Sequence, residues 1–448
     1  MFVPDPQRNE LTGVVLLAKE PMVFHCNHYN RFLQLVVEDC HYIAHDPILR
    51  DPATEVVFRQ LMGLFRQHPE WDTHCRLSAA ETLYRYCGFG DLHFSGIVGS
   101  IGGGVEIHEH HSHYGSALRL NYGIRRRPGE YFDLGYAIGA LSAVYEQPLQ
   151  GKVVAAPPIS MKGQETSFRI TARDPGDQYP LDTAPIAEPM LPPGAENIPP
   201  RSVGLHVDED AIVAAVGTLP LHGNEIGLIP AFGVYLTRHY ADYYNLVSFR
   251  FERALAHALS THKYLGEMLW YEYPSLFFYK EKFGHLQGHA LAQTLLIEAG
   301  HICGFNTMGG IMRSDPWYQL VVPQLRCKED WLAGIIACIN ALGWGIWRIA
   351  ELVPNEKLVL RAWHPYESLG YLRIYGKTAD HPVDYLMTGI GASLMNLLYT
   401  ADITAKPDLT LEFYYQVNRS KEGFWGKQTR CVAQGDPYSE VVVERNQL

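Results

Sequence analysis

Two stretches of the chain show the spacing of apolar residues that is typical of regular structure. In "KEDWLAGIIACINALGWGIWRIAEL" large apolar residues recur every three or four positions, which predicts a helix. These residues are Trp331, Ile335, Ile339 and Leu342. In "VEIHEHHSHYG" one polar residue separates Val105 from Ile107, which predicts a strand that turns these side chains and the next alternate ones towards a core.

The chain contains two similar copies of one pattern. The segment "NELTGVV" returns as "NEIGLIP", and "HCNHYNRFLQ" returns as "YADYYNLVSF", with Asn30 and Asn245 placed 215 positions apart. "YRYCGFG" then matches "GHICGFN", with Cys87 opposite Cys303. Three matches in nearly one register indicate an internal duplication.

The spacing between the copies increases after these cysteines. "HHSHYGSALRLNYG" resembles "WHPYESLGYLRIYG", with His111 opposite His364 at a distance of 253 positions. Copy two therefore carries about 37 extra residues, including the predicted helix, where copy one has only "IVGSIGGG". In each copy the pattern indicates helices, two strands, a helix and a closing hairpin. This order predicts an α+β fold with two tandem copies of an antiparallel sheet covered by helices.

A proline-rich stretch separates the two copies. Residues 174–203 show no periodic pattern, which predicts an extended linker over the surface. We therefore expect a first domain over residues 1–173 and a second domain over residues 204–448.

The second copy resembles a known family. The segments "GKQTRCVAQGDPYSEVVVE", "INALGWGIWRIAEL" and "HPYES" are similar to the 4-vinyl-reductase type of small-molecule-binding domain, which also occurs in aromatic-responsive regulators and is related to TRAPP subunits. The resemblance covers most of residues 225–448 and, more faintly, residues 9–172. It implies a pocket for a small, largely apolar molecule and pairing of domains, so the two copies are expected to form an intrachain pseudo-dimer.

The cysteines of the tail depart from that family. Family members often carry two cysteines eight positions apart, which in the sensors help to hold zinc. Here the two positions are Cys431 and Ser439, and copy one has Ile159 and Ser167. The resemblance therefore implies that the thiolate zinc site of the family is lost in both copies.

Charge and composition narrow the possible partners. The chain has 37 basic and 48 acidic residues, a net charge of −11, and no basic run longer than "RRR", so we expect no nucleic-acid or membrane partner. The N-terminal sequence lacks the pattern of a signal peptide, and the eight cysteines form no CxxC pair, which favours reduced thiols in a cytoplasmic protein. The expected partner is a small-molecule ligand or substrate, with a homodimer as an open alternative.

Histidines gather in the first copy and suggest a metal site. A strand over "VEIHEHHSHYG" would turn Glu109, His111 and His113 inwards, where unpaired polar groups are costly unless a cation gathers them. His25 and His28 are three positions apart and would share one face of a helix. Two or three imidazoles with one carboxylate are typical of catalytic zinc and non-haem iron. We therefore predict that a divalent metal, iron or zinc, is bound by His25, His28, Glu109, His111 and His113.

Other interpretations of these histidines stay open. A histidine-rich strand can be a solvated edge, and the cluster can be structural or pH-responsive. A bulge at the "HH" pair would reverse the side-chain alternation and exchange His111 for His110. In "GHLQGHALAQ", His285 and His289 lie one turn apart, but Leu286 replaces the glutamate of the HExxH pattern, which favours a core or surface position. The lone thiol of Cys26 is typical of a small buried residue.

These observations predict a metal-dependent enzyme that acts on a small organic molecule, with its metal in the first copy. A non-haem iron oxidoreductase and a zinc hydrolase are both compatible with the ligand types. The alternative from another class is a non-enzymatic binding or sensor protein in which the histidine cluster is structural. The sequence shows no Walker A motif, which argues against a complete transcriptional regulator of the kind that carries the related sensor domain.

Overall fold

The computed structural model describes most of the chain. The described residues are 2–94, 97, 101, 103–115, 129–155, 166–173, 181, 188–203, 205–261, 289–418, 420 and 422–445. Within these residues no helix combines the length and the apolar character that a bilayer crossing requires.

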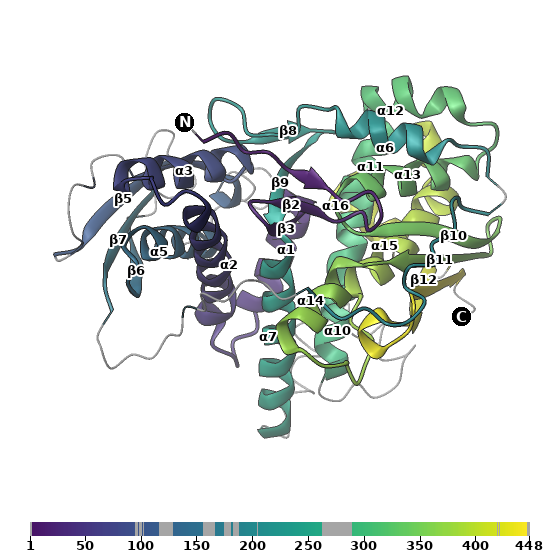
Figure 1. Cartoon of the computed structure of the whole chain (residues 1–448). Coiled ribbons are helices and arrows are strands. Elements are labelled where there is room, and N and C mark those ends of the chain that lie inside the picture. Colours follow the sequence, from purple (N-terminus) through teal and green to yellow (C-terminus); the bar gives the residue numbers. More distant parts are fainter. Residues whose placement is uncertain are drawn as a thin grey trace. The chain divides into compact units, whose positions relative to one another are not determined.

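The strands among the described residues form three antiparallel sheets (Figure 1), and the predicted α+β class is confirmed. The first sheet has the order β1-β2-β3-β9-β8, with β1 Gln7–Arg8, β2 Val15–Leu17, β3 Glu20–Cys26, β8 Ile229–Ala231 and β9 Val234–Tyr240. The second has the order β4-β5-β7-β6, with β4 Gly90–His93, β5 Val105–Ser112, β6 Leu149–Ala155 and β7 Thr166–Ala172. The third has the order β10-β11-β13-β12, with β10 Ile346–Val353, β11 Lys357–Trp363, β12 Phe424–Arg430 and β13 Ser439–Arg445.

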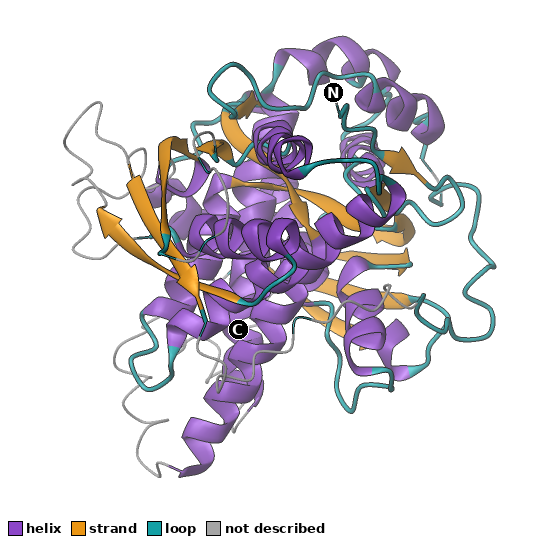
Figure 2. Cartoon of the chain, turned by 60° about the vertical axis from the view of Figure 1, so that its left-hand side comes forward, coloured by secondary structure: helices purple, strands orange, loops and turns teal. Residues whose placement is uncertain are grey.

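The two four-stranded sheets share one topology. In each, the first strand pairs with the second, the second with the fourth, and the fourth with the third. The strands of both sheets lie against helices in Figure 2. An identical strand order in both halves of the chain agrees with the sequence matches between the copies.

Helices occupy most of the remaining described chain. Those of the first copy are α1 Asn27–Glu38, α2 His45–Gln67, α3 Thr73–Tyr86 and α5 Tyr131–Tyr145. Those that follow are α6 Glu209–Gly217, α7 Ala241–Thr261, α10 His289–Cys303, α11 Gly309–Arg313, α12 Asp315–Leu320, α13 Asp330–Ala341, α14 Tyr366–Tyr375, α15 Tyr385–Met395 and α16 Leu411–Asn418.

The chain divides into two compact units, each assembled from three stretches. Unit 1 comprises Met1–Arg31, Leu49–Glu188 and Leu219–Tyr243. Unit 2 comprises the stretches Phe32–Ile48, Pro189–Thr218 and Tyr244–Leu448. The sheet that contains β3 and β9 lies in unit 1, and each four-stranded sheet lies within one unit.

Each copy contains, near its start, a hairpin that the sequence pattern does not predict. The turn between β2 and β3 consists of Ala18 and Lys19, with φ of 48° and 67°. The turn between β8 and β9 consists of Phe232 and Gly233, with φ of 54° and 76°. Positive φ at both central residues is the geometry of a type I′ turn, which suits the twist of paired strands but normally favours Gly or Asn. Three of the four positions therefore hold residues for which this backbone is unfavourable.

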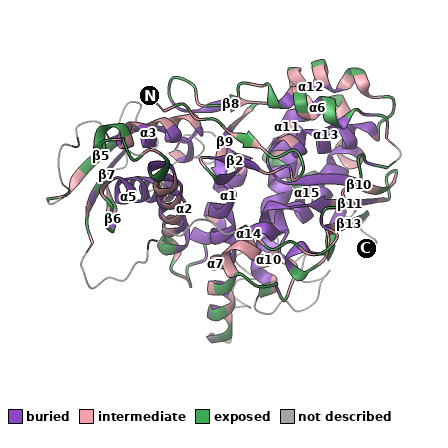
Figure 3. Cartoon of the chain, in the orientation of Figure 1, coloured by how far each residue is buried: buried purple, intermediate pink, exposed green. Residues whose placement is uncertain are grey.

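The predicted helix is confirmed as α13 for the residues with helical spacing, whereas the last part of the quoted segment, from Ile346, forms β10. Trp331, Ile335, Ile339 and Leu342 are buried, and Leu342 caps the C-terminal end of the helix. In Figure 3 both α13 and α15 are drawn almost wholly as buried. The extra residues of copy two lie before β10, whereas "IVGSIGGG" joins β4 to β5, so the placement of the insertion at that glycine-rich segment was wrong.

Glycines allow helices to cross closely in both units. A side chain at Gly389 of α15 would collide with backbone atoms of α10, and one at Gly135 of α5 would collide with the backbone of α2.

The end of the predicted linker packs against the third sheet in unit 2. Val203 N–H donates to the carbonyl of Ile349 at 3.0 Å, so this segment covers the outer edge of β10.

Candidate metal centre

The structure places the five predicted ligands at different positions in unit 1. His25 lies on β3, His28 on the first turn of α1, Glu109 and His111 on β5, and His113 directly after that strand. In the part of the chain that the structure describes, no group of three metal-ligating side chains with ligand atoms within 4.8 Å contains any of the five. The predicted single metal site is therefore not formed by this arrangement.

A bulge in β5 explains where His111 lies. The predicted strand is present, and Ile107 and Glu109 are buried as expected. The register against β4 then shifts, because Glu109 pairs with Leu92 whereas Ser112 pairs with Gly90. The extra residue reverses the alternation, so Ser112 turns inwards and the His111 side chain is 45% exposed. The inward direction predicted for His111 was wrong, and His110, which is also exposed, does not replace it.

Asp91 holds the bulge. Its carboxylate accepts the backbone N–H of His111 at 2.6 Å and lies 2.9 Å from Nδ1 of the same residue. These contacts satisfy polar groups that the interrupted strand pairing would otherwise leave open. His111 therefore has a local structural partner.

Glu109 belongs to a buried network of oxygen atoms. The Tyr84 hydroxyl lies 2.5 Å from Oε1 of Glu109 and 2.7 Å from Oδ1 of Asp133, and Ser112 donates to Oδ2 of Asp133 at 2.8 Å. A hydroxyl carries one proton, so two short contacts to two carboxyl groups require a second proton on the network. Burial raises the pKa of Asp133 to about 7 and raises that of Glu109 well above its usual range. The network therefore retains a proton that an exposed carboxylate would release.

His25 and His113 lie near a third buried imidazole, His239 of β9. Nε2 of His113 lies 3.0 Å from Nδ2 of Asn30, and Nε2 of His239 lies 3.0 Å from the Tyr114 hydroxyl. Burial, followed by the proximity of His113 and His25, lowers the pKa of His239. Burial also lowers the pKa of His113 to about 3, so these imidazoles are neutral near pH 7 and serve as hydrogen-bonding groups of the core.

His28 lines a small pocket in unit 1. The pocket has a volume of about 480 Å³. Its lining consists of Asn27, His28, Pro230, Ala231, Phe232, Gly233, Val234 and Tyr235. Burial lowers the pKa of His28 to about 4, so the lining carries no charge near pH 7.

A different cluster, in unit 2, has the composition of a metal centre. Glu252 of α7 is buried, His289 begins α10, and His381 lies between α14 and α15. Oε1 of Glu252 is 2.9 Å from Nε2 of His381 and 3.2 Å from Nδ1 of His289. Two ligand atoms that lie about 2.1 Å from one metal at right angles are about 3.0 Å apart. The observed separations fit this geometry.

Neighbouring polar groups orient the ligands of this cluster. Asp380 lies 2.6 Å from Nδ1 of His381, which turns Nε2 of that ring towards Glu252. Gln293 donates to Oε1 of Glu252 and Tyr385 donates to Oε2, both at 3.0 Å. A carboxylate that hydrogen-bonds the second ring nitrogen, as Asp380 does for His381, fixes the orientation of ligating histidines in known metal sites.

The ionisation of Glu252 suits a cation. Burial alone would raise its pKa, but the contacts with His381, Gln293 and Tyr385 outweigh burial and lower it. Burial alone would likewise lower the pKa of His381, but Glu252 and Asp380 raise it. The carboxylate is therefore charged, and the cluster attracts positive charge, either as protons on the imidazoles or as a metal ion.

The sequence points to only one member of this cluster. His289 follows His285 by one helical turn, which favours a core or surface position for it; His285 lies outside the described residues. Glu252 and His381 carry no local pattern that links them to His289, because 37 and 92 positions separate them from it. Only the fold brings the three together.

The two tail positions compared with the family do meet in space. The Ser439 hydroxyl donates to Oδ2 of Asp384 at 2.5 Å, and Sγ of Cys431 lies 3.5 Å from the same oxygen. Ser368 also donates to this carboxylate. Hydroxyl groups thus surround a buried carboxylate at this point of unit 2.

A scan against protein-family models found no matching family, and a search of curated proteins found no match either. The resemblance to the 4-vinyl-reductase type of domain therefore stays a prediction.

Proposed function

We propose that the chain is a metal-dependent enzyme that acts on a small organic molecule, with a divalent metal bound by Glu252, His289 and His381. The observation that carries this proposal is the meeting of one carboxylate oxygen and two imidazole nitrogens, at 2.9 and 3.2 Å, from three separate parts of unit 2. Two imidazoles with one carboxylate are the ligands of non-haem iron sites and of many catalytic zinc sites. The proposal places the metal in the second copy, not the first.

The cluster has too few protein ligands to fill the coordination sphere of a metal and is reached by solvent. Three protein ligands leave coordination positions for water and substrate. The side chain of His289 is 49% exposed and that of His381 is partly exposed, whereas that of Glu252 is 4% exposed, so the cluster reaches solvent through its histidines. A metal bound here would polarise a substrate oxygen or lower the pKa of a bound water.

Aromatic residues beside the cluster suggest the substrate class. Tyr371 and Tyr375 of α14 are partly exposed, and the centres of their rings lie 4.7 Å apart. Arg253 donates to the Tyr375 hydroxyl at 2.6 Å, and its guanidinium group lies over the aromatic ring of Tyr375. Rings with an adjacent guanidinium suit an aromatic molecule that carries an anionic group. We therefore propose an aromatic acid as the substrate class.

The competing explanation is that protonated imidazoles alone neutralise Glu252. Measuring the metal content of the purified protein distinguishes metal binding from protonated imidazoles. Wild-type protein loaded with zinc, or with ferrous iron without oxygen, should hold one metal ion per chain more than His289→Ala and His381→Ala, and the same number as His257→Ala. His257 is an exposed histidine on the same helix and belongs to neither metal-ligating group. Equal metal content in all four proteins would refute the proposal.

The pocket beside His28 favours a second candidate, a binding or sensor role for unit 1. Its uncharged lining and volume of about 480 Å³ suit a small neutral molecule. Isothermal titration with a neutral aromatic probe such as phenol tests this role. Binding that is weakened by His28→Ala but unchanged by His289→Ala would support it, and binding unaffected by His28→Ala would refute it.

A further inference from the structure

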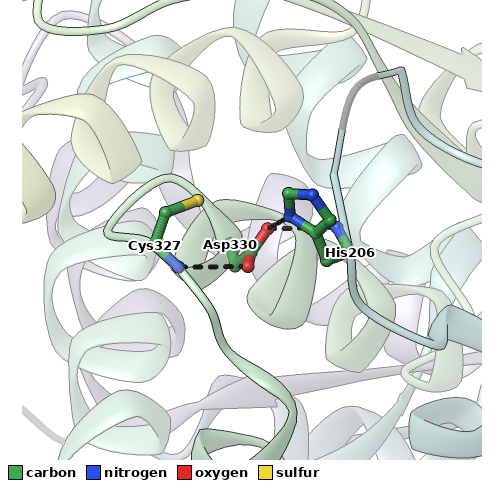
Figure 4. Close-up of side chains that lie close together, drawn as sticks. All are labelled: His206, Cys327 and Asp330. Carbon is green, nitrogen blue, oxygen red and sulfur yellow. Dashed lines mark hydrogen bonds and ion pairs between the residues drawn. The ribbon is translucent and has the colours of Figure 1, made fainter.

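The second metal-ligating group of unit 2 combines sulfur, nitrogen and oxygen. His206 lies in the segment that precedes α6, Cys327 lies in the segment that precedes α13, and Asp330 begins α13 (Figure 4). More than 100 positions of sequence separate His206 from the other two. One ligand atom from each of the three lies within 4.8 Å of the others.

Asp330 is already fixed in place before any ion binds. Its Oδ1 accepts the backbone N–H of His206 at 3.1 Å, and its Oδ2 accepts those of Arg326 at 2.8 Å and Cys327 at 3.3 Å. These three hydrogen bonds hold the carboxylate in position, so it is preorganised.

The imidazole of His206 approaches the same carboxylate. Its Nδ1 lies 3.4 Å from Oδ1 of Asp330, and its side chain is 48% exposed. Nitrogen and oxygen ligands about 2.0 to 2.1 Å from a tetrahedral zinc ion are about 3.4 Å apart. The backbone N–H groups leave lone pairs on the carboxylate, so its hydrogen bonds do not exclude a metal.

We infer that His206, Cys327 and Asp330 form a second metal site, of a type that favours zinc over magnesium or calcium. A thiolate and an imidazole are ligands that zinc prefers, whereas the hard cations prefer oxygen alone. Because both His206 and Cys327 are exposed, the fourth position opens to solvent. A metal here would fasten the segment before α6 to the start of α13. This inference does not depend on the function proposed for Glu252, His289 and His381.

The competing explanation is that Asp330 only fastens the loop through its backbone contacts, with Cys327 as a free surface thiol. The two explanations differ in whether sulfur binds the metal. Cobalt(II) distinguishes them, because a cobalt–thiolate bond gives an intense near-ultraviolet charge-transfer band that nitrogen and oxygen ligands do not give. The site that contains Glu252 has no sulfur ligand, so it does not contribute to this band.

The test is a titration of the full chain with cobalt(II) under reducing conditions. The intensity of the band should saturate at one thiolate-bound cobalt per chain. The band should be absent in Cys327→Ser. In His206→Ala the apparent affinity for cobalt, measured from the band, should fall at least tenfold. The band should persist in Cys75→Ser, a matched exposed cysteine in unit 1, and in the His289→Ala variant.

Two results would overturn the inference. One is the absence of the band in the wild-type protein at cobalt concentrations that saturate its other sites. The other is a band that survives Cys327→Ser, which would assign it to another thiol. Circular dichroism of Cys327→Ser, which changes one exposed atom, confirms that loss of the band does not reflect unfolding. If His289→Ala loses one metal ion but keeps the thiolate band, the two sites bind metal independently of each other.

Discussion

Replacing Asp133 with asparagine should flatten the pH dependence of the stability of unit 1. Burial raises the pKa of Asp133 from 3.8 to about 7, so between these values the folded protein keeps a proton that the unfolded chain has released. Unfolding therefore releases a proton, and the free energy of unfolding falls as the pH rises through this window. Each pH unit contributes about 1.4 kcal/mol, so about three units give a loss of roughly 4 kcal/mol by pH 7.

Asparagine cannot ionise, yet it keeps the shape and an oxygen acceptor for Tyr84 or Ser112. The free energy of unfolding of Asp133→Asn should therefore vary less between about pH 4 and pH 7 than that of the wild type, by up to about 4 kcal/mol. Above pH 7 the variant should equal or exceed the wild type in stability, because it no longer bears the cost of a buried charge.

Urea denaturation followed by circular dichroism at several pH values measures this difference. Asp5→Asn, which removes an exposed carboxylate of the same unit, serves as the control and should keep the pH dependence of the wild type. If Asp133→Asn retained the full wild-type decline between pH 4 and pH 7, the assignment of a retained proton to the network would be refuted.

Three further substitutions test other parts of the fold. Tyr84→Phe should destabilise unit 1 by about 1–3 kcal/mol in urea denaturation, because Glu109 loses a buried hydrogen bond; an unchanged midpoint would contradict this role. Gly389→Ala should cost about 1–3 kcal/mol by calorimetry, since the added methyl group meets the α10 backbone, whereas Gly217→Ala has open space and should cost little. Lys19→Gly removes a side chain from a residue in the left-handed region, with φ of 67°, which should stabilise the fold by about 1 kcal/mol. The greater freedom of glycine in the unfolded chain offsets part of this gain, so Tm should stay equal or rise, and a clear fall in Tm would contradict the turn assignment.

The periodic and repeated features of the sequence predicted much of the fold. Helical spacing located α13, and alternation located β5, because both depend on local geometry that the residue pattern reports directly. The hairpin turns carry no local sequence signal, because Ala18, Lys19 and Phe232 are not the glycine or asparagine that usually marks a type I′ turn. In the hairpins, local propensity was a poor guide because the paired strands impose the turn.

The site was much less predictable than the fold. The direction of His111 depended on a one-residue bulge, which the "HH" pair allowed but did not require. The meeting of Glu252, His289 and His381 depends on how α7, α10 and the segment before α15 pack, which no spacing within the sequence encodes. Histidines are therefore most frequent in the first copy, although the close ligand geometry among the described residues occurs in the second.

The most direct test of the proposed metal centre is anomalous diffraction from crystals of the full chain loaded with zinc or ferrous iron. If these three residues bind the metal, an anomalous peak should lie about 2.0–2.2 Å from Oε1 of Glu252, Nδ1 of His289 and Nε2 of His381. A map without a peak at that position, in crystals that bind the metal elsewhere and keep both imidazoles hydrogen-bonded to Glu252, would contradict it.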